Sequence, residues 1–167
     1  MKLTVLFLFL SLSVFSQSVD ELDKRNGFKD IKLMSTVHDY EGLEYAKDEF
    51  DENYKDVKVY TARKGYYTSI GNIKVYDLEV RTYRDSIYQI MVITEKNPDL
   101  YKGLKKVFGK PEYHMRKEFY HWTGKNLRLS YVPTQKDKLE LTYESFLMRE
   151  KLKDNKEQVI EDIASDF

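Results

Sequence analysis

The sequence predicts a two-layer α+β protein in which helices cover one face of an antiparallel sheet. Three observations predict this class. Apolar and polar residues alternate with a period of two along several short segments after Val57. Segment 98–108 instead repeats its apolar residues at helical spacing. The order short helix, strands, helix, strands, terminal helix is also compatible with two units, each a helix followed by an antiparallel meander.

Composition limits the class of protein. The chain has 167 residues, with 28 basic and 28 acidic side chains, 14 Tyr, 9 Phe and no cysteine. This length suits one domain that buries a core without covalent staples. So many aromatic rings are not typical of a disordered chain, and the balanced charge is not typical of a nucleic-acid binder. Without cysteine there is neither a disulfide nor lipidation at a cysteine. We therefore expect a globular domain without a nucleic-acid partner.

Residues 1–16 have the pattern of a secretory signal peptide. Lys2 precedes an apolar run, and the small residues Val14 and Ser16 fit a cleavage site after Ser16, with Ser18 as second choice. The alternative is an uncleaved membrane anchor, but the run of about 15 residues is shorter than the roughly 20 that span a bilayer. Cleavage would remove one basic residue and leave 27 against 28 acidic ones. The sequence thus predicts a secreted or periplasmic protein of bacterial type that does not span the membrane.

Four segments follow from the changes in composition. After the signal peptide, residues 17–27 predict a flexible leader or a short helix, 28–146 the α+β domain, and 147–167 a charged C-terminal helix or tail. Within the domain, Ser35 predicts the cap of a brief helix that runs toward Leu43. Residues 39–56 hold eight acids and two lysines, which indicates a loop or a frayed helix.

The strands are predicted from the period-two segments. The parity of the apolar positions changes between Val75 and Leu78, so we expect a β-bulge near Tyr76 and Asp77. Arg84 and Asp85 predict a tight turn. The strand after it is apolar on both faces, which favours a central position in the sheet. After the turn at Arg84 and Asp85, the predicted strands are 87–93, 113–122, 127–132 and 138–144.

Helix 98–108 has signals at both ends. Asn97 is a favourable N-cap, and Pro98 suits the first helical position. Lysines near the end favour the negative pole of the helix dipole, and Gly109 suits the left-handed exit. The apolar stripe consists of Leu100, Leu104, Val107 and Phe108.

The usual signatures of catalysis and metal binding are absent from the sequence. It has no G-x-S-x-G, no S-x-x-K and no glycine-rich phosphate loop. His114 and His121 lie seven apart, and in one regular strand they would point to opposite faces. The acidic run 48–53 lacks the order of a calcium loop. We therefore predict no metal and no cofactor.

One pair of carboxylates leaves an enzymatic alternative open. Asp77 and Glu79 share a predicted strand face with Arg81. Two carboxyl groups at a suitable separation are what a glycosidase needs. The other interpretation is a charge-paired outer face of the sheet, which is common in antiparallel proteins.

Aromatic side chains gather on or beside the predicted strands. If 113–122 is one strand, its alternation places Arg116, Tyr120 and Trp122 on one face. Aromatic and Arg side chains dominate the hot spots of protein interfaces. The alternative is that Tyr120 and Trp122 pack beneath helix 98–108 as core. The candidate binding residues are Tyr66, Tyr67, Arg116, Tyr120, Trp122 and Tyr131.

Residues 97–144 resemble a group of small exported bacterial domains. The similarity rests on Leu104–Pro111, on Tyr120-His121-Trp122, and on the alternating segments 127–131 and 139–143. These features resemble the beta-lactamase inhibitory protein and the small outer-membrane-assembly lipoproteins. The resemblance implies a two-layer α+β fold that binds another protein. The chain departs from the group because it lacks lipidation and disulfide cysteines, and no functional residue transfers to it.

Together these observations predict an exported, non-catalytic binding module of the bacterial cell envelope that recognises a protein or a surface polymer. Two alternatives stay open. One is an envelope glycan hydrolase that uses Asp77 and Glu79, and the other is a carrier of a small apolar ligand in a cavity lined by aromatic rings.

Overall fold

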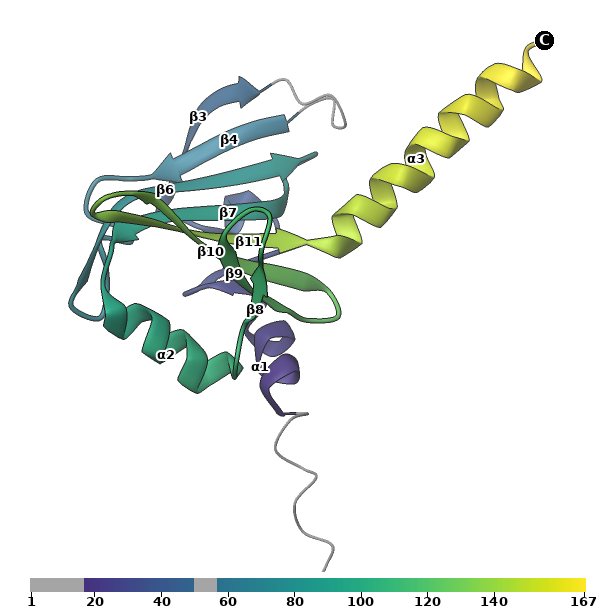
Figure 1. Ribbon diagram of the computed structural model, residues 1–167. Coiled ribbons are helices and arrows are strands. Elements are labelled where there is room, and N and C mark those ends of the chain that lie inside the picture. The colour runs from purple at the N-terminus through teal and green to yellow at the C-terminus, as the bar shows by residue number, and fades with distance from the viewer. Residues whose placement is uncertain (1–16, 50–56) are drawn as a thin grey trace, which may run out of the picture.

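The computed structural model describes residues 17–49 and 57–167, and the predicted signal peptide lies outside them. The described residues form one large antiparallel sheet, a small two-stranded ribbon and four helices (Figure 1). No helix among them combines the length and apolar character needed to cross a membrane. In chain order the elements are α1 (Gln17–Arg25), β1 (Gly27–Phe28), β2 (Ile31–Lys32), the 3-10 helix η1 (Val37–Asp39), β3 (Leu43–Glu49), β4 (Val57–Ala62), β5 (Ser69–Ile70), β6 (Ile73–Tyr83), β7 (Ser86–Glu95), α2 (Pro98–Phe108), β8 (Glu112–His114), β9 (Phe119–Thr123), β10 (Leu127–Gln135), β11 (Lys138–Ser145) and α3 (Phe146–Ser165).

The large sheet consists of two meanders that meet in its middle. Its strand order is β3-β4-β6-β7-β11-β10-β9-β8, and the short strand β5 pairs with β6. After β7 the chain forms α2 and enters the sheet again at the far edge, as β8. It then returns strand by strand until β11 lies antiparallel beside β7. Every pairing is antiparallel, which confirms the predicted type of sheet.

The local signals in the first meander are confirmed. The register of β6 against β7 shifts between Val75 and Asp77, where the parity of the apolar residues changes. Arg84 and Asp85 both have positive φ, 48° and 64°, as the two-residue turn of a tight hairpin requires. Strand β7, apolar on both faces, lies between β6 and β11 in the middle of the sheet.

Helix α2 is confirmed with the predicted bounds. The Asn97 side chain accepts a hydrogen bond from the Asp99 N–H at 2.9 Å, which satisfies one of the free donors of the first turn. Gly109 follows the helix at φ 79°, where a side chain would be strained. Leu100 and Phe108 are buried on the face toward the sheet.

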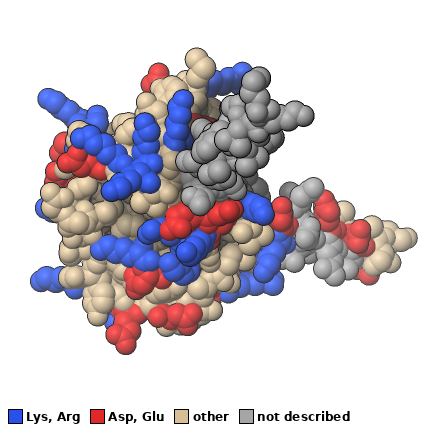
Figure 2. All heavy atoms as spheres, turned by 90° about the horizontal axis from the view of Figure 1, so that it is seen from below, with Lys and Arg blue, Asp and Glu red and all other residues tan. Residues whose placement is uncertain are grey.

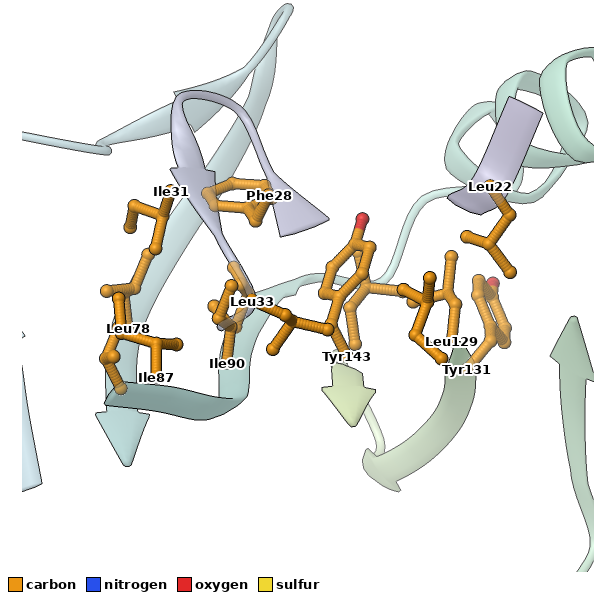
Figure 3. Packing of buried hydrophobic residues seen from close by; sticks show 14 of the residues in the cluster. Leu22, Phe28, Ile31, Leu33, Leu78, Ile87, Ile90, Leu129, Tyr131 and Tyr143 are labelled. Carbon is orange, nitrogen blue, oxygen red and sulfur yellow. The ribbon is translucent and has the colours of Figure 1, made fainter. Parts of the chain in front are cut away.

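One face of the sheet carries the core. Alternate residues of the central strands are nearly inaccessible to solvent, as the period-two pattern requires. Figure 3 shows how the ribbon β1–β2 sets Phe28 and Ile31 over this face, while α1 contributes Leu22 beside Leu129 and Tyr131. The strand residues at the centre of this cluster are Leu78, Val80, Ile90, Val92, Leu127, Leu129, Leu139 and Leu141.

The predicted class, a two-layer α+β protein with helices on one face of the sheet, is wrong. The described chain is mostly β, and its helices are few. The first meander lacks the helix that a repeated helix-plus-meander unit would need, because the segment after Ser35 forms only one 3-10 turn. The Ser35 hydroxyl donates to the Lys32 carbonyl oxygen at 2.7 Å instead of capping a helix. The ribbon β1–β2 fills that part of the core layer, and α3 leaves the sheet (Figure 1).

The loop or frayed helix predicted within residues 39–56 is also wrong at Leu43–Glu49. Residues Leu43–Glu49 form the edge strand β3, which pairs with β4. Only Leu43 of this strand is buried, and the exposed acids extend into solvent, as is usual at a sheet edge. Acidic residues therefore did not prevent a strand here. Residues 50–56 of this segment lie outside the described residues.

Residues 17–25, expected as a leader or a short helix, form α1, which is anchored at two points. Leu22 is buried in the core. The Asp23 carboxylate accepts hydrogen bonds from the Lys125 and Asn126 N–H groups at 2.7 and 2.9 Å. Helix α1 therefore holds the turn between β9 and β10, next to the surface described below.

Candidate functional site

The segment 113–122, predicted as one strand, is a hairpin. Strands β8 and β9 pair antiparallel, with Tyr113 opposite Tyr120, and the chain reverses at residues 115–118. A period-two argument fails across such a turn because alternation restarts on each strand. Arg116 consequently lies exposed in the turn, and the predicted common face of Arg116, Tyr120 and Trp122 does not exist.

Three tyrosines stand together at this end of the sheet, and we call them the tyrosine ridge: Tyr101, Tyr113 and Tyr120. The Tyr120 ring centroid lies 4.9 Å from that of Tyr113 and 5.3 Å from that of Tyr101 of α2. Tyr113 is 49% exposed and Tyr120 36%, whereas Tyr101 is half-buried. Each ring is thus held by its neighbour while part of its surface stays in solvent.

The ridge stands on a buried aromatic base. Trp122 is 4% exposed, and its Nε1–H donates to the Gly109 carbonyl oxygen at 2.8 Å. Tyr101 contacts both Trp122 and Tyr131, at centroid separations of 6.4 and 5.7 Å. Burial raises the pKa of Tyr131, so its ring stays neutral well into the alkaline range. Trp122 and Tyr131 therefore belong to the core, and Tyr120 connects them to the surface.

Tyr66 and Tyr67 belong to a different ring group. Their centroids are 6.3 Å apart, and Tyr67 also contacts Phe28 of the ribbon β1–β2. The Tyr67 hydroxyl donates to the Asp30 carboxylate at 3.2 Å. Burial and the charge of Asp30 raise the pKa of Tyr67. Of the six predicted binding residues, Tyr120, Trp122 and Tyr131 are thus brought together, and the pair Tyr66 and Tyr67 is separate.

The face of the hairpin opposite the ridge carries both histidines of this region. His114 stacks on Phe119 at 5.2 Å, and His121 contacts the same ring at 5.7 Å. The expectation that His114 and His121 point to opposite faces is therefore wrong, for the same reason as above: the turn between them resets the parity. Among the described residues no three metal-ligating side chains gather at one place.

Glu79 of β6 lies in a network of charge pairs on the outer face of the sheet. Glu79 lies 3.9 Å from Arg81, whose guanidinium also contacts Glu49 at 3.0 Å and donates to Gln89 at 2.8 Å. The Asp77 carboxylate accepts a hydrogen bond from the Leu78 N–H at 2.9 Å. This arrangement is the charge-paired outer face that the sequence offered as the alternative to a catalytic pair.

A hollow of about 560 Å³ lies against β3 and β4, and sequence reasoning missed it. Tyr45 is 54% exposed in its wall and meets Tyr60 edge to face at 5.9 Å. Lys58 in the lining lies 3.5 Å from Asp85, whose charge raises the pKa of Lys58. The alternation of Leu43 and Tyr45 with charged residues was the one available signal. The lining residues are His38, Leu43, Glu44, Tyr45, Asp48, Lys58, Tyr60 and Arg63.

Comparison of the chain with protein-family models, with curated proteins and with solved structures finds no match. The resemblance of residues 97–144 to exported inhibitor and lipoprotein domains therefore stays a prediction.

Proposed function

We propose that this protein is an exported, non-catalytic binding protein that recognises another protein through the tyrosine ridge. The observation that carries the proposal is the mutual packing of Tyr101, Tyr113 and Tyr120 over the buried Trp122. Rings already held in place lose little conformational freedom when a partner covers them. Tyrosine also combines a large apolar surface with a hydroxyl that can form hydrogen bonds, which suits a protein interface.

The position of the ridge supports an extended polypeptide as the partner. Strand β8 lies at the edge of the sheet, so within residues 17–49 and 57–167 the backbone of Glu112–His114 is paired on one side only. An incoming strand can add to such an edge, with alternate side chains packing on the exposed rings. Arg116 in the adjoining turn supplies a cation near the same edge.

The described residues do not favour the two alternative functions, a glycan hydrolase and a carrier of an apolar ligand. A hydrolase would need Asp77 and Glu79 to face a substrate, but Glu79 faces Arg81, and neither residue lines the hollow. An apolar-ligand carrier would need a cavity among the rings. The opening beside Trp122 measures about 70 Å³, which has room for about two water molecules and not for a lipid chain.

The test begins with a partner identified by crosslinking the protein in an envelope extract of its host. The affinity of the purified pair is then measured for the wild type and for Tyr113→Ser/Tyr120→Ser. We expect affinity to fall at least tenfold in this variant, because both rings lose their contact surface. The matched control is Tyr66→Ser, which removes an exposed ring from the other group and should leave affinity unchanged. Equal affinity of the ridge variant and the wild type would refute the ridge as the binding surface.

Export is tested on the protein as the host produces it. If residues 1–16 are a signal peptide, the protein recovered from the envelope or the medium begins at Gln17. The intact mass of that protein decides between cleavage after Ser16, cleavage after Ser18 and no cleavage. An uncleaved protein in the cytoplasmic fraction would contradict the proposed export.

The hollow at β3 and β4 favours a second candidate function, the binding of a surface polysaccharide. Its wall combines the exposed Tyr45 ring with side chains of both charges, Glu44 and Asp48 against Lys58 and Arg63. An aromatic face and groups that donate and accept hydrogen bonds suit a neutral sugar. Titration calorimetry with linear oligosaccharides tests this candidate. Binding should be lost in Tyr45→Ala and kept in Tyr66→Ala. Absence of heat from the wild type with every sugar tried would remove the candidate.

A further inference from the structure

Helix α3 leaves the body of the protein after its first turn (Figure 1). Met148 is buried at 4% against Val57 and Tyr88, on the outer side of the sheet. From Glu150 to Phe167, every side chain that the structure describes is exposed. Most of the stability of a helix in a protein comes from the tertiary packing of one face and not from the helix propensity of its residues. The described residues of this chain supply no such packing beyond Met148.

The charges of α3 are divided along its length. Residues 147–156 contain four basic and two acidic residues, whereas residues 157–167 contain four acidic and no basic residues. In Figure 2 the outer half of the helix accordingly shows red and no blue. The first turn has no acid and the last turn no base. This order is the reverse of what the helix dipole favours, so the charges weaken α3 when it stands alone.

The outer half also carries an uncovered apolar stripe. Ile160 is 57% exposed and Ile163 55%, and the fully exposed Phe167 follows four residues later. Spacings of three and four place these side chains on one face of the helix. Within the described residues this stripe has no cover, so the outer half of α3 presents an apolar face to solvent.

We propose that α3 pairs antiparallel with α3 of a second copy of this chain. An antiparallel arrangement sets the basic half of each helix beside the acidic half of the other and opposes the two dipoles. A partner that is acidic throughout would repel the outer half, and a basic one would repel the inner half. A partner must therefore carry the same division of charge in reverse order. A second copy does so by symmetry, and a twofold pair forms a closed dimer.

The charges also suggest where the two helices cross. The boundary between the basic and acidic halves falls between Lys156 and Glu157. If the twofold axis passes there, Lys156 of one copy lies level with Glu157 of the other. Lys153 then lies level with Ile160, and seven residues are close to two helical turns, so these two positions share one face of α3. The apolar stripe of each helix therefore lies beside lysines of the other, whose aliphatic stems can cover it.

Charge reversal in the full chain tests the pairing. We expect the wild type to form a dimer in sedimentation equilibrium, with an affinity that falls as salt rises. The variants Glu157→Lys/Glu161→Lys and Lys151→Glu/Lys153→Glu should each be monomeric, because like charges then face each other. An equimolar mixture of the two should dimerise again. The matched control is Lys105→Glu/Lys106→Glu on α2, which makes the same change in net charge as the second variant and should leave the dimer intact.

A monomeric wild type at its highest soluble concentration would overturn the proposal, as would reversed variants that stay dimeric. A mixture that stays monomeric would also overturn it, provided circular dichroism shows that both variants are folded. None of these outcomes bears on the tyrosine ridge, which lies on other elements.

Orientation is tested by crosslinking, which the lack of native cysteine makes simple. With a short bismaleimide, Glu157→Cys should crosslink to itself across the twofold axis. Ile163→Cys alone should not, but a mixture with Arg149→Cys, a position on the same helix face and within one residue of the level of Ile163, should give the mixed dimer. Efficient crosslinking of Ile163→Cys to itself would indicate parallel helices and contradict the antiparallel pair.

Discussion

Helices α2 and α3 lie in the same chain but differ in what stabilises them: α2 has favourable end residues and a buried face, whereas α3 has neither along most of its described length. Helix α2 has a side-chain N-cap, an acid in its first turn and lysines in its last turn, and it buries Leu100 and Phe108. Helix α3 follows Ser145 without a side-chain cap bond and has the reverse order of charge, and every side chain that the structure describes after Met148 is exposed. Each of these features makes α2 the more stable of the two helices.

The difference shows that local end signals and tertiary contacts contribute separately to the stability of a helix. End signals of α2 are each of the order of 1 kcal/mol. Its contacts with the aromatic base are larger, because a buried aromatic side chain contributes several kcal/mol. Beyond Met148, the described residues of α3 have neither contribution, so in our proposal a second copy supplies the missing contacts. The four predictions below test this contrast, from the largest expected effect to the smallest.

Replacing Trp122 with Ala should have the largest effect, because it removes the ring between α2 and the sheet. The ring contacts Phe108 at 6.4 Å, and Nε1–H binds the Gly109 carbonyl at the end of α2. We expect the free energy of unfolding to fall by about 3–5 kcal/mol. Urea denaturation measures it. Trp122→Phe keeps most of the packing and should cost clearly less. A loss below 1 kcal/mol in Trp122→Ala, on the same order-of-magnitude scale, would mean that α2 does not depend on this ring.

Alkaline pH should destabilise the sheet through its buried tyrosines, a residue type that α3 does not contain. Tyr143 on β11 is buried, and burial raises its pKa above the ordinary value of about 10. Its stabilising contribution is present below pH 10, and is lost as pH rises from there toward the folded-state pKa. The loss is about 1.4 kcal/mol for each pH unit.

The urea midpoint as a function of pH measures this loss, and Tyr143→Phe should show a shallower decline above about pH 10. Tyr67 and Tyr131 also have raised pKa values, so part of the slope will remain in that variant. Identical slopes in Tyr143→Phe and wild type would contradict the buried, neutral phenol.

Substituting the N-cap residues of α2 and α3 compares how much each cap contributes to stability. Asn97→Ala breaks the bond to the Asp99 N–H and should cost about 1 kcal/mol of stability. Ser145→Ala removes no cap bond and should cost far less. Asn97→Asp is the control that keeps an acceptor. Thermal unfolding measures all three, and equal losses at the two positions would show that the caps do not distinguish the helices.

The smallest effect is expected from correcting one charge of α3. Asp166→Lys places a cation at the negative end of the helix and should stabilise it by about 0.3–1 kcal/mol. Helical signal in circular dichroism at low protein concentration measures the gain. Asp166→Asn should give a smaller gain, because it only removes the unfavourable charge. A lower helical signal in Asp166→Lys would contradict the dipole argument.

Much of the local structure could be read from neighbouring residues. Asn97, Pro98 and Gly109 predict the ends of α2, because caps depend on residues within one turn of the helix. The bulge at Val75–Asp77 follows from parity alone. Leu43–Glu49 escaped prediction because its acidic residues resemble a loop, and only pairing with β4 makes it a strand.

The candidate site was partly within reach of the sequence. Aromatic enrichment indicated Tyr120, Trp122 and Tyr131 as one neighbourhood, since all lie on adjacent strands. Tyr101 was hidden in a helix pattern, and its contact with Tyr120 depends on how α2 docks. Arg116 was misplaced because a turn reset the alternation on which the prediction rested.

By itself, the sequence determined where most strands and helix α2 lie, and it determined the division of charge along α3. Those properties depend on periodicity and on residue type over a few positions, so they need no distant contact. The tertiary structure decided the class of the fold, because the ribbon β1–β2 rather than a second helix covers Leu78 and Ile90. It also decided which aromatic rings are exposed. Trp122 and Tyr120 lie two residues apart on one face, and only the end of α2 buries the first and leaves the second partly in solvent.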